Sequence, residues 1–179
     1  MKLDLSDVTI CAVDSVNVGP AASALDRSVA QCRFADAILF SHRPAHGSFR
    51  TIKTDRIGST GAYSDFVFKR LPGMIETPFV LIVQWDGYVI DPNAWSPGFR
   101  DYDYIGARWP FVSDGMTVGN GGFSLRSRRF MSAMMESRFP IHEGENSDWL
   151  VCRTYRPQLE SDFRVRFAPE SRCGQTSVA

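Results

Sequence analysis

One short segment places residues capable of chemistry directly after a buried strand. The apolar run Phe79–Val83 stops abruptly at Gln84-Trp85-Asp86-Gly87. A run this short and this rich in Val and Ile is typical of a strand buried on both faces, as in parallel sheets. Ligands of open α/β sheets bind just beyond the carboxyl ends of such strands. A carboxylate there, beside an aromatic ring and a glycine, therefore predicts a metal or sugar site; an ordinary Asp-Gly turn is the alternative.

Two further segments could complete such a site. Asp14 and Ser15 follow the apolar run Val8–Val13, so the same rule places them near a nucleoside, with a plain turn as the alternative. The run Gly119-Asn120-Gly121-Gly122 matches neither a Walker A loop nor a dinucleotide-binding motif. Its glycines would permit close backbone approach to a ligand, and its asparagine offers a donor and an acceptor to sugar hydroxyls. A bulge or tight turn is the alternative for this run.

Strands and helices alternate along the first half of the chain. Short apolar runs predict strands at Val8–Val13, Ala37–Phe40 and Phe79–Val83. Apolar residues at helical spacing predict two helices, one carrying Leu25, Val29 and Cys32 and the other carrying Tyr63, Phe66, Val67 and Leu71. The polar stretch between Phe40 and Ser59 is expected to be a loop. This order predicts an α/β fold with a mostly parallel central sheet, helices on both faces and right-handed crossovers.

The second half of the chain gives weaker signals. We expect a strand at Phe123–Arg126, an amphipathic helix from Phe130 to Met135, a last helix capped by Ser147 and ended by Pro157, and a closing strand at Arg164–Ala168. Arg126, Arg128 and Arg129 could neutralise phosphate or simply mark an exposed basic helix start. No internal repeat or low-complexity linker is present, so a single domain covering residues 1–179 is expected.

The composition is that of an ordinary globular protein, 44% hydrophobic and 22% charged. Twenty basic and twenty acidic residues cancel, so no global field favours nucleic acid or anionic membrane. The amino terminus lacks the apolar region of a secretory signal, and no apolar stretch approaches the roughly 20 residues of a membrane span. The four cysteines are scattered without a Cys-x-x-Cys pair, which favours buried, reduced thiols in a cytoplasmic protein over a zinc site or a disulfide framework.

Three segments together resemble a known family in order and spacing. They are Gln84–Val89, Asp103–Pro110 and Val118–Ser127, and the last contains the specific block Gly-Asn-Gly-Gly-Phe-Ser-Leu-Arg. They are similar to the DUF5672 family of small, mostly bacterial proteins regarded as GT-A-like glycosyltransferases. The similarity continues through Asp148–Pro157 and Arg166–Pro169 and so spans nearly the whole chain. The tail Gln175–Ala179 departs from the family pattern, so the chain is expected to be truncated or divergent there.

The resemblance implies a GT-A-like fold, a nucleotide-binding α/β sandwich that transfers a sugar from a nucleotide donor to an acceptor hydroxyl. In GT-A enzymes an Asp-x-Asp motif holds a divalent cation, Mn²⁺ or Mg²⁺, against the donor diphosphate. The matching site here has one carboxylate, Asp86, so metal dependence is an open question. The resemblance also implies His142 as a second metal ligand, with a solvated loop histidine as the alternative.

The resemblance further implies roles for three other side chains. Asp148 becomes the candidate general base of an inverting transfer, because the first turn of a helix favours an ionised carboxylate. A plain helix-stabilising aspartate is the alternative. Trp85 and Trp109 could stack on a base or a sugar face, although most tryptophans of this kind are core residues.

Three functions remain in competition. The leading one is a nucleotide-sugar-dependent glycosyltransferase acting on a saccharide or another hydroxyl acceptor. The second is a non-catalytic nucleotide- or sugar-binding relative, which the single carboxylate at Asp86 and the altered tail would suit. A hydrolase using Ser or Cys is disfavoured, because neither a Gly-x-Ser-x-Gly elbow nor a Cys–His pairing is evident.

Overall fold

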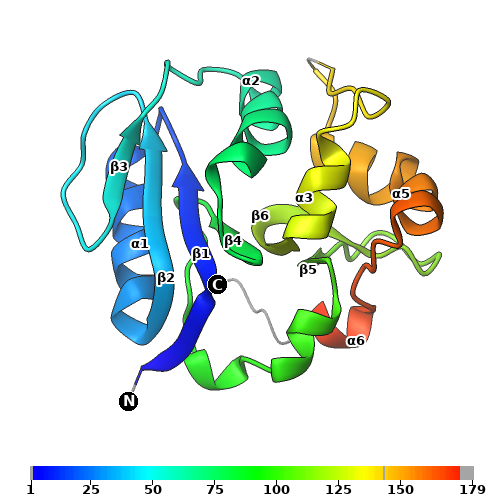
Figure 1. Cartoon of the computed structure of the whole chain (residues 1–179), viewed down its shortest axis with the longest axis horizontal. Helices are drawn as coiled ribbons and strands as arrows, with labels where there is room; N and C mark the ends of the chain where they lie inside the picture. Colours follow the sequence, from blue (N-terminus) through cyan, green and yellow to red (C-terminus); the bar gives the residue numbers. More distant parts are fainter. Residues whose placement is uncertain (1, 143, 174–179) are drawn as a thin grey trace.

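Six strands form one mixed sheet in the order β3-β2-β1-β4-β6-β5 (Figure 1). The computed structural model describes residues 2–142 and 144–173 of the chain. β1 pairs in parallel with β2 on one side and with β4 on the other, and β2 pairs in parallel with β3. β6 runs antiparallel to both β4 and β5. The strands are β1 Leu3–Val13, β2 Cys32–Ser41, β3 Arg50–Lys53, β4 Phe79–Val83, β5 Tyr104–Arg108 and β6 Val118–Ser127.

The predicted arrangement of the first three apolar strands is confirmed. Val8 lies opposite Phe79, and Ile10 lies opposite Ala37, so the three runs are neighbours in one mostly parallel sheet. All six residues from Val8 to Val13 are buried. Burial of consecutive residues is possible because both faces of β1 are covered, which explains why the strand reads as a continuous apolar run.

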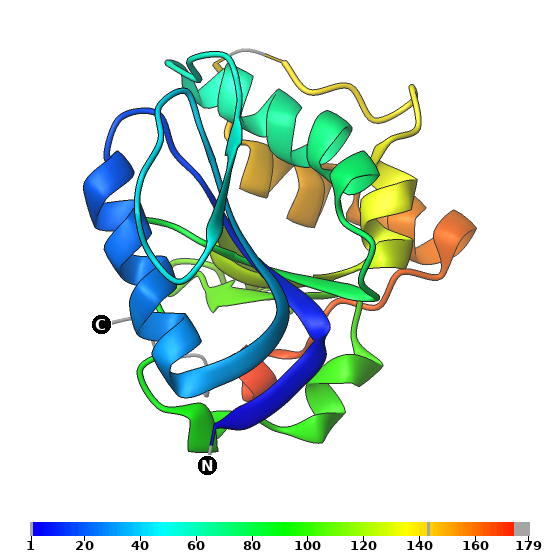
Figure 2. The ribbon, with the colours of Figure 1, turned by 60° about the vertical axis from the view of Figure 1, so that its left-hand side comes forward.

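Helices cover both faces of the sheet, as Figure 2 shows, with α1 on one side and α2 and α3 on the other. The α1 side is completed by the segment after β4, because Gln31 donates to the carbonyls of Val89 and Ile90, and Val89 donates to Ser28 Oγ. The long helices and short helical turns of the chain are α1 Val18–Gln31, α2 Thr60–Asp65, the π-helix Phe66–Arg70, the 3₁₀ turns Leu71–Met74, Pro92–Ala94 and Pro97–Asp101, α3 Arg128–Met134, α4 Ser147–Trp149, the π-helix Leu150–Thr154, α5 Arg156–Phe163 and α6 Glu170–Cys173.

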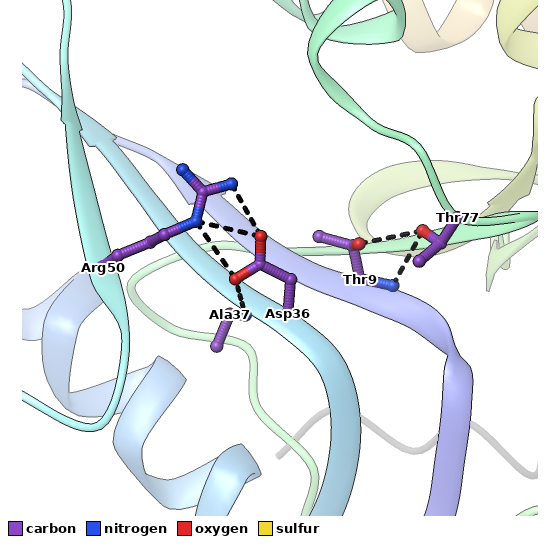
Figure 3. A network of polar contacts seen from close by, with 5 residues as sticks. All are labelled: Thr9, Asp36, Ala37, Arg50 and Thr77. Carbon is purple, nitrogen blue, oxygen red and sulfur yellow. Dashed lines mark hydrogen bonds and ion pairs between the residues drawn. The ribbon is translucent and has the colours of Figure 1, made fainter.

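Polar contacts tie the strands of the parallel half to one another (Figure 3). The Arg50 guanidinium on β3 contacts the Asp36 carboxylate on β2, with Nε 2.9 Å and Nη2 2.6 Å from Oδ2. The Thr77 hydroxyl, just before β4, lies 2.8 Å from the Thr9 hydroxyl and accepts a hydrogen bond from the Thr9 amide at 3.2 Å. These contacts fix where β3 and β4 join the sheet.

Several element predictions are wrong in their boundaries. The stretch between Phe40 and Ser59, predicted to be a loop, contains β3. This strand lies at the edge of the sheet, where polar side chains are tolerated, so its sequence has no apolar pattern. Cys32 opens β2 instead of lying on the preceding helix. Arg164–Ala168 is not a strand, since a single bridge joins Tyr104 to Phe167.

Pro157 begins a helix instead of ending one. It occupies the first turn of α5, where its missing N–H costs nothing. The N-cap of α4 is Asn146, one residue earlier than predicted, and its side chain accepts from the Trp149 amide. The predicted departure at Gln175–Ala179 lies outside the described residues.

Three cysteines, Cys11, Cys32 and Cys152, are free and buried. Burial raises the pKa of the Cys11 and Cys152 thiols to about 12 and that of Cys32 to about 11. Within the described residues, no helix has the length and apolar content needed to cross a bilayer.

Candidate functional site

The two segments singled out by the sequence meet at the carboxyl end of β4. The antiparallel register of β6 pairs Ser124 with Ile82, so the glycine-rich start of β6 lies beside the residues that follow β4. A Cβ on Gly122 would come within 2.7 Å of Gln84 Oε1, and a Cβ on Gly87 would lie 3.7 Å from the Gly122 carbonyl. The glycines therefore permit a close approach between the two segments, which are 35 residues apart (122 − 87).

Asp148 reaches the same place from α4. Asn146 caps this short helix, and the Ser147 hydroxyl is 2.8 Å from that of Ser64 on α2. These contacts leave the Asp148 carboxylate to accept a hydrogen bond from the Gly121 amide at 2.9 Å. A Cβ on Gly121 would overlap Oδ1 of Asp148, so the contact requires glycine at this position. Asp148 is thus turned toward β6 and does not cap its own helix.

Arg126 is the main feature of the site whose role the sequence did not reveal. It stands on β6 only 2% exposed, with its guanidinium 4.9 Å from the ring centre of Phe68 and 5.5 Å from that of Tyr104. Nε donates to Ser124 Oγ at 3.0 Å and Nη2 donates to the Gly121 carbonyl at 3.4 Å. Nη1 is buried without a hydrogen-bond partner among the described residues.

The charges around Gly121 are coupled. Burial raises the pKa of Asp148, while the Arg126 charge and the Gly121 amide oppose that rise. We expected the helix terminus to favour the ionised carboxylate, but burial outweighs the two opposing effects and the pKa of Asp148 lies above its ordinary value. Burial also raises the pKa of Tyr63 to about 12. Tyr63 therefore stays a neutral phenol, and its oxygen accepts a hydrogen bond from Gln84 Nε2 at 3.2 Å.

The exposed part of the site follows Gln84. Trp85 is half exposed, and Asp86 is exposed and makes no side-chain hydrogen bond or ion pair with the described residues. Asn120 is also exposed, and its side-chain oxygen accepts from the Gly122 amide at 3.0 Å. These three side chains are therefore accessible to a ligand.

Asp14 and Ser15 lie at the end of β1, the strand beside β4. Asp14 Oδ1 accepts from the amides of Val16 and Asn17 at 2.7 and 2.6 Å, which shapes the turn into α1. Ser15 is buried, and its hydroxyl accepts from the Ile57 amide at 3.0 Å. Both side chains organise the loops at this edge of the sheet. A direct contact with a nucleoside stays a prediction.

The described residues offer a metal ion few ligands at this site. Among the described residues, no group of three His, Cys, Asp or Glu side chains is placed to bind an ion. His142 is exposed in the loop before α4, and its role as a second ligand stays a prediction. Asp86 supplies one accessible hard oxygen ligand. That donor set fits a cation shared with a diphosphate, because Mg²⁺ commonly binds one or two carboxylates plus substrate phosphates.

Trp109, the other predicted stacking residue, lies on the far side of Gly121 from Gln84. It is 9% exposed, and its ring fills the space where a Cβ on Gly119 would stand. Its ring centre is 5.4 Å from that of Trp149, the residue after Asp148. Trp109 is therefore mainly a core residue, and its ring also packs beside the candidate site through Gly119 and Trp149.

A cavity of about 630 Å³ lies on the opposite face of the sheet. It is lined by apolar residues of the sheet, including Leu5, Leu81 and Leu125, and by the segment from Tyr88 to Phe99. None of the predicted site residues is among the described residues that line it.

A family model described as "Protein of unknown function (DUF5672)" matches residues 47–169. No curated protein sequence matches the chain. A mannosyltransferase from Pyrobaculum calidifontis, solved with GDP-Man and Mn²⁺, is similar in structure, with a TM-score of 0.58 at 10% identity over 90% of this chain and 53% of that one. The glycosyltransferase GlyE of Streptococcus pneumoniae, in its apo form, gives 0.54 at 14% identity over 92% of this chain and 45% of that one.

A third similar structure is a nucleotidyltransferase. The 2-C-methyl-D-erythritol 4-phosphate cytidylyltransferase of Thermus thermophilus gives a TM-score of 0.51 at 12% identity, over 88% of this chain and 85% of that one. At such low identity these likenesses show the fold alone, which is the predicted GT-A-like α/β sandwich. This chain spans about half the length of the two glycosyltransferases.

Proposed function

The chain belongs to the DUF5672 family, and on that premise we propose that it is a glycosyltransferase that moves a sugar from a nucleotide-sugar donor to an acceptor hydroxyl. The observation that carries the proposal is the meeting of Gln84, Gly121 and Asp148, which come from three separate segments. They lie where α/β sheets bind their ligands, beyond the carboxyl end of a central strand.

The donor would lie over the ends of β1 and β4. Asp86 would hold a divalent cation together with the diphosphate, and this cation would supply charge stabilisation of the leaving group. Gln84, which donates a hydrogen bond to Tyr63, and the exposed amide of Asn120 would hydrogen-bond sugar or ribose hydroxyls. Trp85 offers an exposed ring to the same ligand.

Asp148 would serve as the general base. A base must come within about 2.6–3.2 Å of the proton it removes, and it must be ionised to act. Burial raises the pKa of Asp148 toward the range in which a base works best, while Arg126 limits the rise. The Gly121 amide donates to one carboxylate oxygen, and the other would accept the proton of the acceptor hydroxyl.

A second candidate function is binding without catalysis. The single carboxylate of the Gln84-Trp85-Asp86 segment favours it, because the described residues include no cluster of three metal-binding side chains. Such a protein would hold a nucleotide or a sugar at the same edge of the sheet and leave it unchanged.

A binding screen separates these possibilities. Nucleoside diphosphates and nucleotide sugars are tested by thermal shift and calorimetry, with and without Mn²⁺. Binding should raise the unfolding temperature, since a ligand that prefers the native state stabilises it. Binding followed by transfer or donor hydrolysis supports the enzyme, and binding without turnover of any donor supports the second candidate. If no nucleotide or nucleotide sugar binds under either condition, the transferase and the nucleotide-binding form of the second candidate both fail, and sugar binding alone is left.

Asp86→Ala tests the donor site. It should abolish transfer and the effect of Mn²⁺ on binding at little cost in stability, because an exposed carboxylate at a strand end contributes little to packing. Asp101→Ala is the matched control, an exposed aspartate in the 3₁₀ turn Pro97–Asp101. An active Asp86→Ala enzyme would remove Asp86 from the site.

A further inference from the structure

Three aromatic rings cluster beside the candidate site; Phe111 and Trp149 are exposed, and Trp109, which contacts both, is largely buried. Trp109 and Phe111 follow β5, and Trp149 belongs to α4. The ring centre of Trp109 is 6.2 Å from that of Phe111 and 5.4 Å from that of Trp149, with interplanar angles of 28° and 32°. Phe111 is 73% exposed and Trp149 is 42% exposed. Exposed rings that cluster in this way are typical of binding surfaces.

The rings are held in place from behind. Trp109 packs on Gly119, where a side chain would collide with its ring, and its amide donates to the Thr117 carbonyl at 2.8 Å. The Arg153 guanidinium lies 4.5 Å from the ring centre of Trp149. Arg153 is itself held by an ion pair with Asp114 and a hydrogen bond to the Met116 carbonyl. The side chains of Trp109 and Trp149 are therefore held in position before a ligand binds.

The aromatic surface adjoins the candidate base. Gly119 and Gly121 are two residues apart in the irregular first part of β6. Trp109 packs on the first and Asp148 on the second, and Trp149 follows Asp148 directly. The surface lies on the β5 side of Asp148, whereas Asp86 and the end of β1 lie on the other side, toward β4.

We propose that Phe111 and Trp149, supported by Trp109, form the acceptor subsite and that the acceptor places a saccharide ring on these two exposed rings. A pyranose ring has a face of C–H groups that packs on an aromatic ring, and a rim of hydroxyls that needs polar partners. The aromatic surface has such partners at its edge in the exposed Asn120 amide and the Asp114–Arg153 pair. The Asn120 NH₂ group makes no hydrogen bond with the described residues, and the Asp114 carboxylate stays 48% exposed beside Arg153, so both could bind hydroxyls that a purely apolar acceptor lacks. The inference rests on the proposed function for the role of Asp148, but the binding surface can be tested without a donor.

The four tryptophans provide a residue-specific test. The indole N–H signals of ¹⁵N-labelled protein are assigned with single Trp→Phe variants and followed while methyl glycosides and disaccharides are added. The signals of Trp109 and Trp149 should move, and that of Trp95, which packs on Phe99 away from the site, should stay. Phe111→Ala and Trp149→Ala should each weaken saccharide binding by roughly tenfold, the loss typical of one stacking contact. Met135→Ala, a substitution of an exposed apolar residue elsewhere, should leave binding unchanged.

Each outcome decides the proposal. Selective movement of the Trp109 and Trp149 signals, shifted to higher saccharide concentration in Phe111→Ala, supports the subsite even if no nucleotide binds, in which case the proposed transfer fails alone. Nucleotide binding with no selective response to any saccharide overturns the subsite and leaves the transferase proposal standing. Signals that change with protein concentration instead of saccharide would show that a second copy covers the rings, which also overturns it.

Discussion

Asp148 and Arg126 are opposite charges that share one backbone residue instead of forming a direct ion pair. Asp148 accepts from the Gly121 amide and Arg126 donates to the Gly121 carbonyl. A buried guanidinium with an unpaired Nη1 costs stability unless an anion lies near it. The nearby Asp148 carboxylate partly meets that need, and the Arg126 charge in turn opposes the effect of burial on the pKa of Asp148.

Asp148→Asn tests the base. The change keeps the shape of the side chain and removes its basicity, so donor binding should survive while turnover falls by about 10²–10⁴-fold. Because burial raises the pKa of Asp148 in the folded state, its ionisation costs stability as pH rises through the unfolded and then the folded pKa. The variant should therefore be no less stable than wild type above that range. Transfer rates and unfolding temperatures measure this, and near wild-type turnover would leave the base unidentified.

The charge of Arg126 should be visible in the pH dependence of transfer. A base works when ionised, so the rate falls as pH drops through its pKa. Arg126→Met removes the charge that lowers the pKa of Asp148, which should move the acid limb of the kcat/KM profile to higher pH. Arg126→Lys keeps the charge and should leave the limb close to its original position. Identical profiles for the two variants would show that Arg126 acts through packing alone.

At the scale of elements, the site depends on the glycine-rich start of β6. Gly121→Ala places a methyl group against the Asp148 carboxylate and 2.8 Å from Arg126 Nη2, so α4 must shift away from β6. We expect a loss of transfer at least as large as that of Asp148→Asn, with a moderate loss of stability. Gly19→Ala is the control, because a Cβ on Gly19 meets nothing within 4 Å and alanine favours a helix by up to about 1 kcal/mol. Kinetics and thermal unfolding of both variants give the comparison.

The elements that the sequence predicted well are those whose apolar pattern is strong. The buried runs of β1 and β4 and the stripe from Tyr63 to Leu71 were found because nearly every residue in them contributes to the core. β3 and α5 were missed for the opposite reason. β3 has no buried residue, and α5 buries only Leu159 within its described span, so neither carries an apolar period.

At the scale of the molecule, the site is assembled by sheet topology. Asp148 and Gly121 are 27 residues apart and meet because β6 runs back along β4. The sequence could predict that Asp86 and Asp14 lie at one edge, since both follow parallel strands. The glycine-rich segment joins them because β6 is antiparallel to β4, which the rule for parallel strands does not provide. The sequence could not predict the buried position of Arg126, because a charged residue beside a basic helix start reads as exposed.

The alkylation rates of the buried thiols report on local opening of the site. A thiol reacts with an alkylating reagent as the thiolate, and a pKa of about 12 together with full burial keeps Cys152 unreactive while the fold is closed. Its sulfur lies 3.7 Å from the Gly119 carbonyl, so modification requires a local opening that separates α4 and the following π-helix from β6.

A bound ligand that bridges Asp148 and β6 should therefore slow alkylation of Cys152 more than that of Cys32, which lies at the start of β2. A Cys173→Ser protein is alkylated with and without nucleotide or saccharide, and mass spectrometry gives the separate alkylation rates of Cys152 and Cys32. Equal slowing at both thiols would mean that they become accessible only when the whole sheet unfolds.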